Sequence, residues 1–212
     1  MLKIKSFVFS PVQENTYLLY NESNECIIID PGCYFPEEKE EMRSFIEENG
    51  LHPKLLINTH CHLDHVFGNK FAADTYGLTL AIHEKEKAML DIAPASGLMY
   101  NLPFDSYSGE IRYIHDGDFL GLGEDELEVI FAPGHSPGHI CFYCARQHFI
   151  ICGDVLFKRS IGRTDLPGGN YDVLISNIRK RLFTLPGTTI VYSGHGPTTT
   201  IAEEINENPF LN

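Results

Sequence analysis

The sequence predicts an α/β protein in which helices cover the outer faces of β-sheets. Short apolar runs bounded by turn residues recur in both halves of the 212-residue chain and are typical of buried strands. Between them lie segments that place apolar residues at helical spacing and charged residues on the remaining positions,. Strands flanked by such amphipathic helices indicate sheets with helices packed on their outer faces.

The composition is that of a soluble globular protein. Hydrophobic residues make up 43% of the chain and charged residues 21%, and the length is most simply explained by a single domain, residues 1–212. No apolar run approaches the roughly 20 residues that span a bilayer. The N-terminus opens into a strand-like alternation and lacks the apolar segment of a signal peptide,. We therefore expect a cytoplasmic protein without a membrane partner.

The net charge argues against a nucleic-acid partner. Asp and Glu outnumber Lys and Arg by 29 to 16, which gives a formal net charge of −13. Binding to phosphate backbones requires a basic surface. The charge therefore disfavours a nuclease, and the expected partner is a small-molecule substrate.

The first half of the chain alternates predicted strands and helices. We expect strands over residues 3–10, 15–20, 26–30, 54–58 and 78–82. Three helices are predicted in this half. The first begins at Pro36 and stops at Gly50, the second covers 66–76 and ends before Gly77, and the third covers 84–91,. Residues 94–109 are rich in Pro, Gly, Ser and aromatic residues. So long a loop is uncommon unless it is functional, so we expect a lid over a site there.

The second half returns to strands, predicted over residues 127–132, 140–145, 149–152 and 189–192. A helix is predicted over 170–183, with apolar residues at helical spacing and Asn170 as its N-cap,. A last short helix is expected from Ile201 onward.

Six cysteines are spread through the chain, and most lie inside apolar runs. This placement predicts reduced, buried thiols that pack as small hydrophobic groups. Cys141 and Cys144 have the spacing of a redox motif, but they lie in a strand-like run and we interpret them as core residues,.

Seven metal-binding side chains gather in one short cluster and three separate positions. The cluster is His60-Cys61-His62-Leu63-Asp64-His65, and the separate residues are His135, Asp154 and His195. Imidazole and carboxylate groups suit zinc, iron or manganese, and seven of them are enough for two ions that share a carboxylate.

The cluster's spacing indicates a loop just before a helix. On an extended segment His65 would point away from the other three ligands. We therefore expect His60 and His62 to hold one ion, while Asp64 and His65 turn to hold the other.

Each of the four ligand groups directly follows an apolar strand. The strand residues are 55–57, 129–131, 149–151 and 190–192. If these strands end at one edge, their loops converge there and a rigid scaffold holds the ligands in place.

The full pattern resembles the metallo-β-lactamase fold superfamily over nearly the whole chain. The resemblance implies a four-layer α/β/β/α sandwich with a metal site at one edge of its two sheets. It also implies the assignment of all seven ligands: His60, His62 and His135 to the first ion, Asp64, His65 and His195 to the second, and Asp154 as the bridge. Asp30, in Ile29-Asp30-Pro31-Gly32, is placed near the site as a supporting residue.

Within this superfamily the chain looks like a glyoxalase II-type thioester hydrolase. The supporting motifs are Thr59-His60 to His65, Gly153-Asp154-Val155-Leu156-Phe157, residues 160–169 and Gly194-His195-Gly196-Pro197. The ending, with 17 residues after His195, resembles a short bacterial branch without the C-terminal helical domain that helps larger relatives bind glutathione. Arg163 falls where the family places a basic residue near the glutathione carboxylate, which a guanidinium binds well,.

The expected reaction is hydrolysis of an acyl thioester, with glutathione as one candidate carrier. Two divalent ions, expected to be zinc with iron or manganese as alternatives, would supply a metal-bound hydroxide as nucleophile. Asp64 is the candidate catalytic residue, because it both ligates and can orient the hydroxide.

Two other activities remain open at this point. One is a persulfide dioxygenase that uses a single iron, for which His60, His135 and Asp154 offer two imidazoles and a carboxylate,. The other is lactone hydrolysis. A non-enzymatic binding module is disfavoured. Structural zinc sites are usually closed four-coordinate cages, whereas seven ligands shared by two ions leave open positions.

Overall fold

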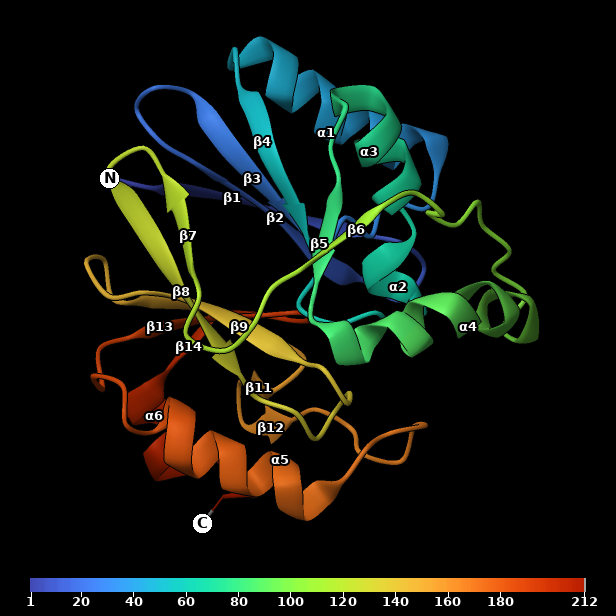
Figure 1. Ribbon diagram of the computed structural model, residues 1–212. Coiled ribbons are helices and arrows are strands. Elements are labelled where there is room, and N and C mark those ends of the chain that lie inside the picture. Colours follow the sequence, from blue (N-terminus) through green and yellow to red (C-terminus); the bar gives the residue numbers. More distant parts are fainter. Residues whose placement is uncertain (212) are drawn as a thin grey trace. The chain divides into compact units, whose positions relative to one another are not determined.

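The computed structural model describes residues 1–211, which form two compact units. The first unit comprises Met1–Ile114 with Gly121–Asp125, and the second comprises His115–Leu120 with the chain from Glu126 onward. Each unit is built on a six-stranded sheet with helices packed on it (Figure 1).

The sheet of the first unit has its strands in chain order. They are β1 (Lys3–Phe9), β2 (Glu14–Tyr20), β3 (Glu25–Ile29), β4 (His52–Ile57), β5 (Leu80–Ile82) and β6 (Ile111–Tyr113). The first three strands are antiparallel, whereas β3 to β6 run parallel. The residues that follow β3 and β4 therefore leave the sheet at the same edge.

One face of this sheet is covered by helices. They are α1 (Pro36–Glu48), α2 (Leu63–Val66), α3 (Asn69–Tyr76), the 3-10 turn η1 (Glu84–Glu86) and α4 (Lys87–Met99). A buried cluster joins strand residues such as Ile28 and Leu56 to helix residues such as Met42, Val66 and Leu90. Cys26 and Ile28 of β3, two positions apart, both lie in this cluster, as expected for side chains on the one face of the sheet that the helices cover.

The second sheet has the order β14-β13-β10-β9-β8-β7. Its strands are β7 (Phe119–Leu122), β8 (Asp125–Phe131), β9 (Ile140–Cys144), β10 (Phe149–Gly153), β13 (Ile190–Ser193) and β14 (Thr199–Thr200). Strand β9 is antiparallel to both β8 and β10, and β10 is parallel to β13. Consequently β8, β10 and β13 all point in one direction.

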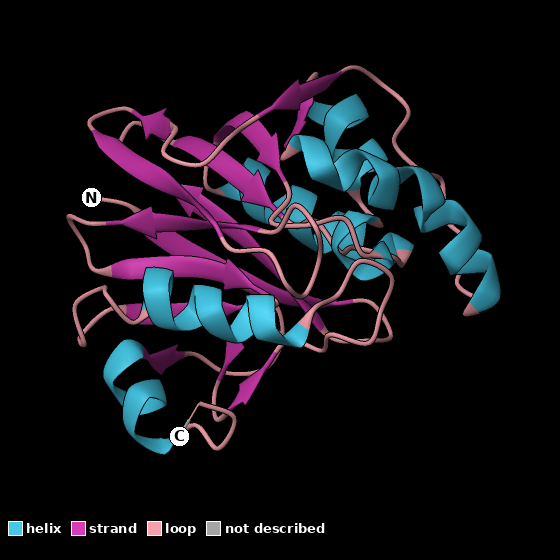
Figure 2. Ribbon diagram, turned by 60° about the horizontal axis from the view of Figure 1, so that its bottom comes forward, coloured by secondary structure: helices cyan, strands magenta, loops and turns pink. Residues whose placement is uncertain are grey.

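The helices of the second unit are α5 (Tyr171–Asn177), the π-type turn η2 (Ile178–Leu182) and α6 (Ile201–Glu207). Leu174, Ile178 and Ile201 pack with Ile150 and Val191 of the sheet. A small hairpin of β11 (Leu156–Phe157) and β12 (Ser160–Ile161) follows β10. In Figure 2 the helices lie beside the strands, and none is inserted between neighbouring strands of a sheet.

The prediction of a loop over residues 94–109 was wrong for its first residues. Helix α4 passes through Pro94 and continues to Met99. A proline inside a helix removes one hydrogen bond and crowds the carbonyl four residues before it. Burial of Met89, Leu90, Ala93 and Gly97 along one side of α4 offsets that cost.

The helix expected over 66–76 is divided into α2 and α3. Its break lies at Gly68, whose N–H donates to the carbonyl of Pro31 at 2.7 Å. A Cβ at this position would lie 2.4 Å from Cys33 Sγ, so the close approach requires glycine. The helix expected over 170–183 is likewise interrupted, at Ile178, where the π-type turn begins.

Five short strands were not predicted: β6, β7, β11, β12 and β14. None exceeds four residues, which is too short for an alternating pattern to stand out in the sequence.

The six cysteines are free and buried, as predicted. Burial raises the pKa of Cys26 and Cys33 to about 12, so these thiols are neutral at physiological pH. Among residues 1–211, no helix has the length and apolar character needed to cross a membrane.

The predicted N-cap of α5 gives a first test. Asn170 Oδ1 accepts a hydrogen bond from the Val173 N–H at 3.0 Å. We expect Asn170→Ala to lower the free energy of unfolding by about 1 kcal/mol, because an N–H of the first turn loses its acceptor. Asn170→Asp retains an acceptor and should match the wild type in urea denaturation. Equal stability of the Ala and Asp variants would contradict the capping role.

Candidate metal centre

The histidine cluster of the first unit lies between a strand and a helix, as predicted. Strand β4 ends at Ile57 and α2 begins at Leu63, so His60 and His62 lie in the connecting loop while Asp64 and His65 lie in the helix. The ring centroids of His60 and His62 are 4.7 Å apart, and those of His60 and His65 are 4.1 Å apart. The turn into α2 thus brings the three imidazoles of the cluster together.

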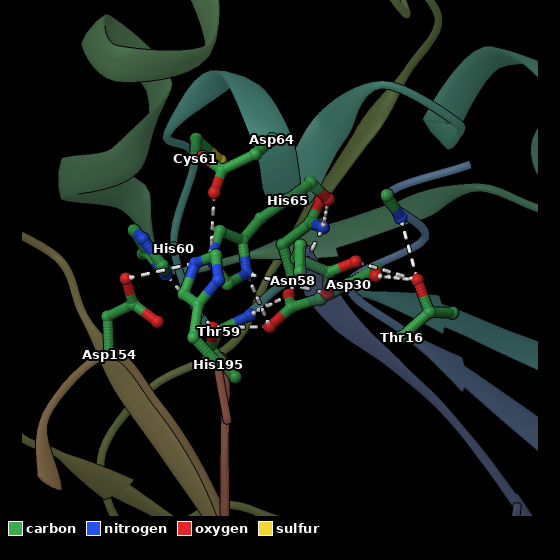
Figure 3. A network of polar contacts seen from close by, with 12 residues as sticks. Thr16, Asp30, Asn58, Thr59, His60, Cys61, Asp64, His65, Asp154 and His195 are labelled. Carbon is green, nitrogen blue, oxygen red and sulfur yellow. Dashed lines mark hydrogen bonds and ion pairs between the residues drawn. The ribbon is translucent and has the colours of Figure 1, made fainter. Parts of the chain in front are cut away.

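Asp30 is the hub of a buried hydrogen-bond network beneath these rings (Figure 3). Its Oδ1 accepts from the Thr59 N–H at 2.7 Å, and its Oδ2 accepts from the Thr59 hydroxyl at 2.6 Å. Its backbone has φ 48°, a left-handed conformation in which Asp is among the better-tolerated residues. The predicted supporting position of Asp30 is therefore confirmed by its contacts.

The network fixes which nitrogen of His60 carries the proton. Thr59 Oγ1 gives its single hydrogen to Asp30, so it can only accept at its 3.0 Å contact with His60 Nδ1,. His60 Nδ1 therefore carries the hydrogen and Nε2 presents a lone pair. A hydrogen bond from the second ring nitrogen to an oxygen acceptor is the usual way to orient a metal-binding histidine, and here the acceptor is the Thr59 hydroxyl, which Asp30 holds in turn.

Asp30 also acts on His65. Its Oδ2 lies 3.1 Å from His65 Nδ1, which favours a proton on that nitrogen. One ligand atom from each of Asp30, His60 and His65 lies within 4.8 Å of the others. Because both Asp30 oxygens already accept hydrogen bonds from Thr59, we interpret Asp30 as the residue that orients the ligands and not as a ligand itself.

Two buried glutamates in the first unit were missed in the sequence. Glu86 Oε2 accepts the N–H of Cys61 at 2.8 Å and so holds the backbone between His60 and His62. Glu14 Oε1 lies 3.8 Å from His65 Nδ1, and burial raises the pKa of Glu14 well above its usual range. Neither glutamate lies in a motif, so only the three-dimensional packing reveals them.

The three ligands predicted in the second unit share one sheet edge. His135 follows β8, Asp154 follows β10 and His195 follows β13. These strands point in one direction, so their carboxyl ends meet at the same edge. Within this unit the predicted convergence of loops is confirmed.

One oxygen of Asp154 lies between two imidazoles. Asp154 Oδ2 is 3.5 Å from His135 Nε2 and 3.7 Å from His195 Nε2, longer than ordinary hydrogen bonds. Two atoms that bind one ion tetrahedrally at about 2.0–2.2 Å lie roughly 3.3–3.6 Å apart. The 3.5 Å distance lies within this range and the 3.7 Å distance just above it, and imidazole with carboxylate suits divalent metal ions. Asp154 Oδ2 is therefore placed where it could share one ion with His135 and another with His195.

His135 is oriented by the backbone of Arg163. His135 Nδ1 lies 2.7 Å from the Arg163 carbonyl oxygen, so Nδ1 carries the proton and Nε2 presents its lone pair on the side of Asp154. The Arg163 side chain instead makes two contacts with Asp165, Nε–Oδ1 at 2.7 Å and Nη2–Oδ2 at 2.8 Å. Arg163 thus belongs to the site through its carbonyl group, which the sequence did not predict.

His139 was also missed. It is fully buried, and its Nε2 accepts the N–H of Asp154 at 3.1 Å. The available signal was its position four residues after His135, in Gly134-His135-Ser136-Pro137-Gly138-His139. His139 holds the backbone of the residue whose carboxylate lies between two histidines.

A family model described as the metallo-beta-lactamase superfamily matches residues 9–195. The chain belongs to this superfamily. The predicted fold class, α/β of the metallo-β-lactamase type, is thereby confirmed, and with it a metal-dependent hydrolase. The fold implies a site for two metal ions.

Curated relatives in this superfamily match over almost their full length. The probable metallo-hydrolase YqgX of Bacillus subtilis is 37% identical, covering 100% of this chain and 98% of the relative. The hydroxyacylglutathione hydrolase GloC of Haemophilus influenzae is 36% identical, covering 100% of this chain and 99% of the relative.

Solved structures of the superfamily match as well. The BLEG-1 B3 metallo-beta-lactamase superimposes with a TM-score of 0.91 at 35% identity, covering 99% of this chain and 100% of that chain. TTHA1623, in a di-iron-bound form, gives a TM-score of 0.88 at 32% identity, covering 98% of this chain and 100% of that chain.

Gly162 tests how tightly the second-unit ligands are packed. A Cβ there would lie 1.8 Å from the Asp154 carbonyl oxygen and 3.1 Å from His135 Nδ1. Because backbone atoms must move, we expect Gly162→Ala to lower the free energy of unfolding by about 2 kcal/mol and to reduce bound metal. Gly121→Ala is the matched control, since its Cβ would meet nothing within 4 Å. Similar metal content and unfolding midpoints in both variants would contradict this packing.

His139 gives a second test. His139→Leu removes the acceptor for the Asp154 N–H and should weaken zinc binding about 10- to 100-fold, as for other groups that orient metal ligands. His139→Gln carries an acceptor at a similar reach and should recover most of the affinity. Competition with a chromophoric zinc chelator measures both values. Wild-type affinity in the Leu variant would rule out the assigned role.

Proposed function

We propose that the two units act together as one hydrolase domain, residues 1–212, that cleaves hydroxyacyl thioesters. In this proposal all seven predicted ligands form one two-ion centre: His60, His62 and His135 for the first ion, Asp64, His65 and His195 for the second, and Asp154 between them. Glutathione is one candidate thiol carrier, because a full-length relative is a hydroxyacylglutathione hydrolase.

The position of Asp154 Oδ2, 3.5 Å from His135 Nε2 and 3.7 Å from His195 Nε2, carries the proposal. A single oxygen at metal-sharing distance from two imidazoles fits a bridging carboxylate. The proton positions assigned to His60 and His135 support it further, because each leaves Nε2 as the metal-binding atom. The free, buried thiols support a reducing compartment, the cytoplasm.

When bound, two divalent ions would supply a hydroxide at neutral pH and would stabilise negative charge on a carbonyl oxygen. The protein's task is to hold its donors in place. Asp30 orients His60 and His65, and the Arg163 carbonyl orients His135. Asp64 is the proposed catalytic residue, since its carboxylate is 15% exposed and Oδ2 lies 3.8 Å from His65 Nε2, within reach of both solvent and ligand.

Leaving-group chemistry favours thioesters. A thiol of pKa about 8.5 leaves as the thiolate without much protonation. An amide nitrogen is a far poorer leaving group and normally requires a proton donor.

Cleavage of β-lactams is the second candidate, because BLEG-1, which is 35% identical, is a B3 metallo-beta-lactamase. Lactone hydrolysis and iron-dependent persulfide oxidation remain as hypotheses from the sequence. The di-iron form of TTHA1623 supports iron as well as zinc as the native metal, and it supports two ions over one.

The decisive experiment combines metal analysis with a substrate panel. Purified protein is assayed for zinc, iron and manganese and then tested on S-lactoylglutathione, a β-lactam, a lactone and a persulfide. We expect two ions per chain and turnover of the thioester, lost after chelation and restored by metal. His62→Ala and Asp154→Ala should each lower kcat/KM at least about 100-fold, because losing a ligand costs more than losing its supporting contact.

The matched control is His52→Ala, since His52 is exposed on β4, away from the motif. It should keep wild-type turnover and metal content. Full thioesterase activity in either His62→Ala or Asp154→Ala would refute the ligand assignment, and oxygen uptake with the persulfide in place of hydrolysis would replace the proposed reaction.

A further inference from the structure

Each of the three cations between residues 156 and 163 is paired with a carboxylate of the protein. Lys158 Nζ lies 3.3 Å from Glu203 Oε1, and Arg159 is paired with Glu207. Arg163 makes its two contacts with Asp165. Because each cation is paired with a carboxylate, this segment presents little net positive charge to an anionic substrate. The rest of the chain does not compensate, since the formal net charge of the whole chain is −13.

Arg163 is the cation of this group that lies against a proposed metal ligand. Its carbonyl oxygen is the hydrogen-bond acceptor of His135, so its backbone is fixed beside that imidazole. Its side chain is 59% exposed and that of Asp165 is 70% exposed. The guanidinium is thus open to solvent while its backbone is held at the candidate site.

The contact geometry matches the way an arginine binds a free carboxylate. Nε and Nη2 each meet a different oxygen of Asp165, at 2.7 and 2.8 Å, which is the bidentate arrangement. A substrate carboxylate that used the same two N–H groups would have to displace Asp165.

We propose that Asp165 is a specificity-determining residue that competes, within the protein, with substrate carboxylates for Arg163. This inference rests on the proposed thioesterase function and adds that Asp165 weakens the binding of thioesters whose thiol carrier bears a carboxylate, without affecting uncharged carriers.

The pair persists at neutral pH. Hydrogen bonding to Arg163 lowers the pKa of Asp165 from 3.8 to about 2. A lowered pKa means that the pairing is fully present above the ordinary value and is lost only as the pH falls towards 2. Since exposed ion pairs are weak, the competition is modest and is screened by salt.

The test compares Asp165→Asn with wild type on two substrates. S-lactoylglutathione has carboxylates on its carrier, whereas S-lactoyl-N-acetylcysteamine has none. We expect kcat/KM to rise about two- to fivefold for the first through a lower KM and to stay unchanged for the second. The rise should shrink at high salt and should vanish in Arg163→Gln/Asp165→Asn.

Glu207→Gln is the matched control. It removes one negative charge from the same unit and frees Arg159, in place of Arg163, from its carboxylate partner. An equal gain in this variant would show a general charge effect and would overturn the role of Asp165, as would an equal gain on the uncharged substrate.

A binding measurement separates this inference from the proposed function. Titration of S-methylglutathione into the metal-loaded protein requires no turnover. Tighter binding to Asp165→Asn than to wild type and to Glu207→Gln supports the competition even if no thioester is hydrolysed. Unchanged binding overturns it even if thioesters are hydrolysed.

Discussion

The Asp30 carboxylate makes the contacts on which the arrangement of the histidine cluster in the first unit depends. It reaches His65 directly and His60 through the Thr59 hydroxyl, so one buried charge sets the proton positions of two imidazoles. A bound divalent cation would in turn offset the cost of burying that charge. Asp30 also has a left-handed backbone conformation. Such strain persists where the surrounding hydrogen bonds fix the backbone, and it is common at functional sites.

The second unit positions its predicted ligands through strand direction and backbone contacts. Three strands that point one way deliver His135, Asp154 and His195 to one edge. Two hydrogen bonds that involve backbone groups then complete the orientation: the Arg163 carbonyl orients His135, and His139 holds Asp154 by accepting its N–H. Neither contact depends on a charged partner, so the two units hold their imidazoles by different physical means.

Much of the fold was predictable from the sequence, because strands such as β3 and β10 are continuous apolar runs and helices such as α1 have a clear charged side. Helix α4 was misjudged because local propensity makes Pro94 a breaker, whereas burial of Leu90 and Ala93 decides the outcome,. Ligand types and their loops could be read from spacing. The roles of three buried residues, Glu14, Glu86 and His139, could not be predicted in this way. These roles depend on contacts with neighbours distant in sequence or with a backbone N–H, which residue identity does not encode.

Position 163 divides two tasks between two parts of one residue. Its main chain steadies the imidazole of His135, and every amino acid offers that carbonyl group. Its side chain extends into solvent, where a change would leave the imidazole's hydrogen bond intact. Mutation can therefore change the side chain exposed at this position while the hydrogen bond that orients His135 stays in place.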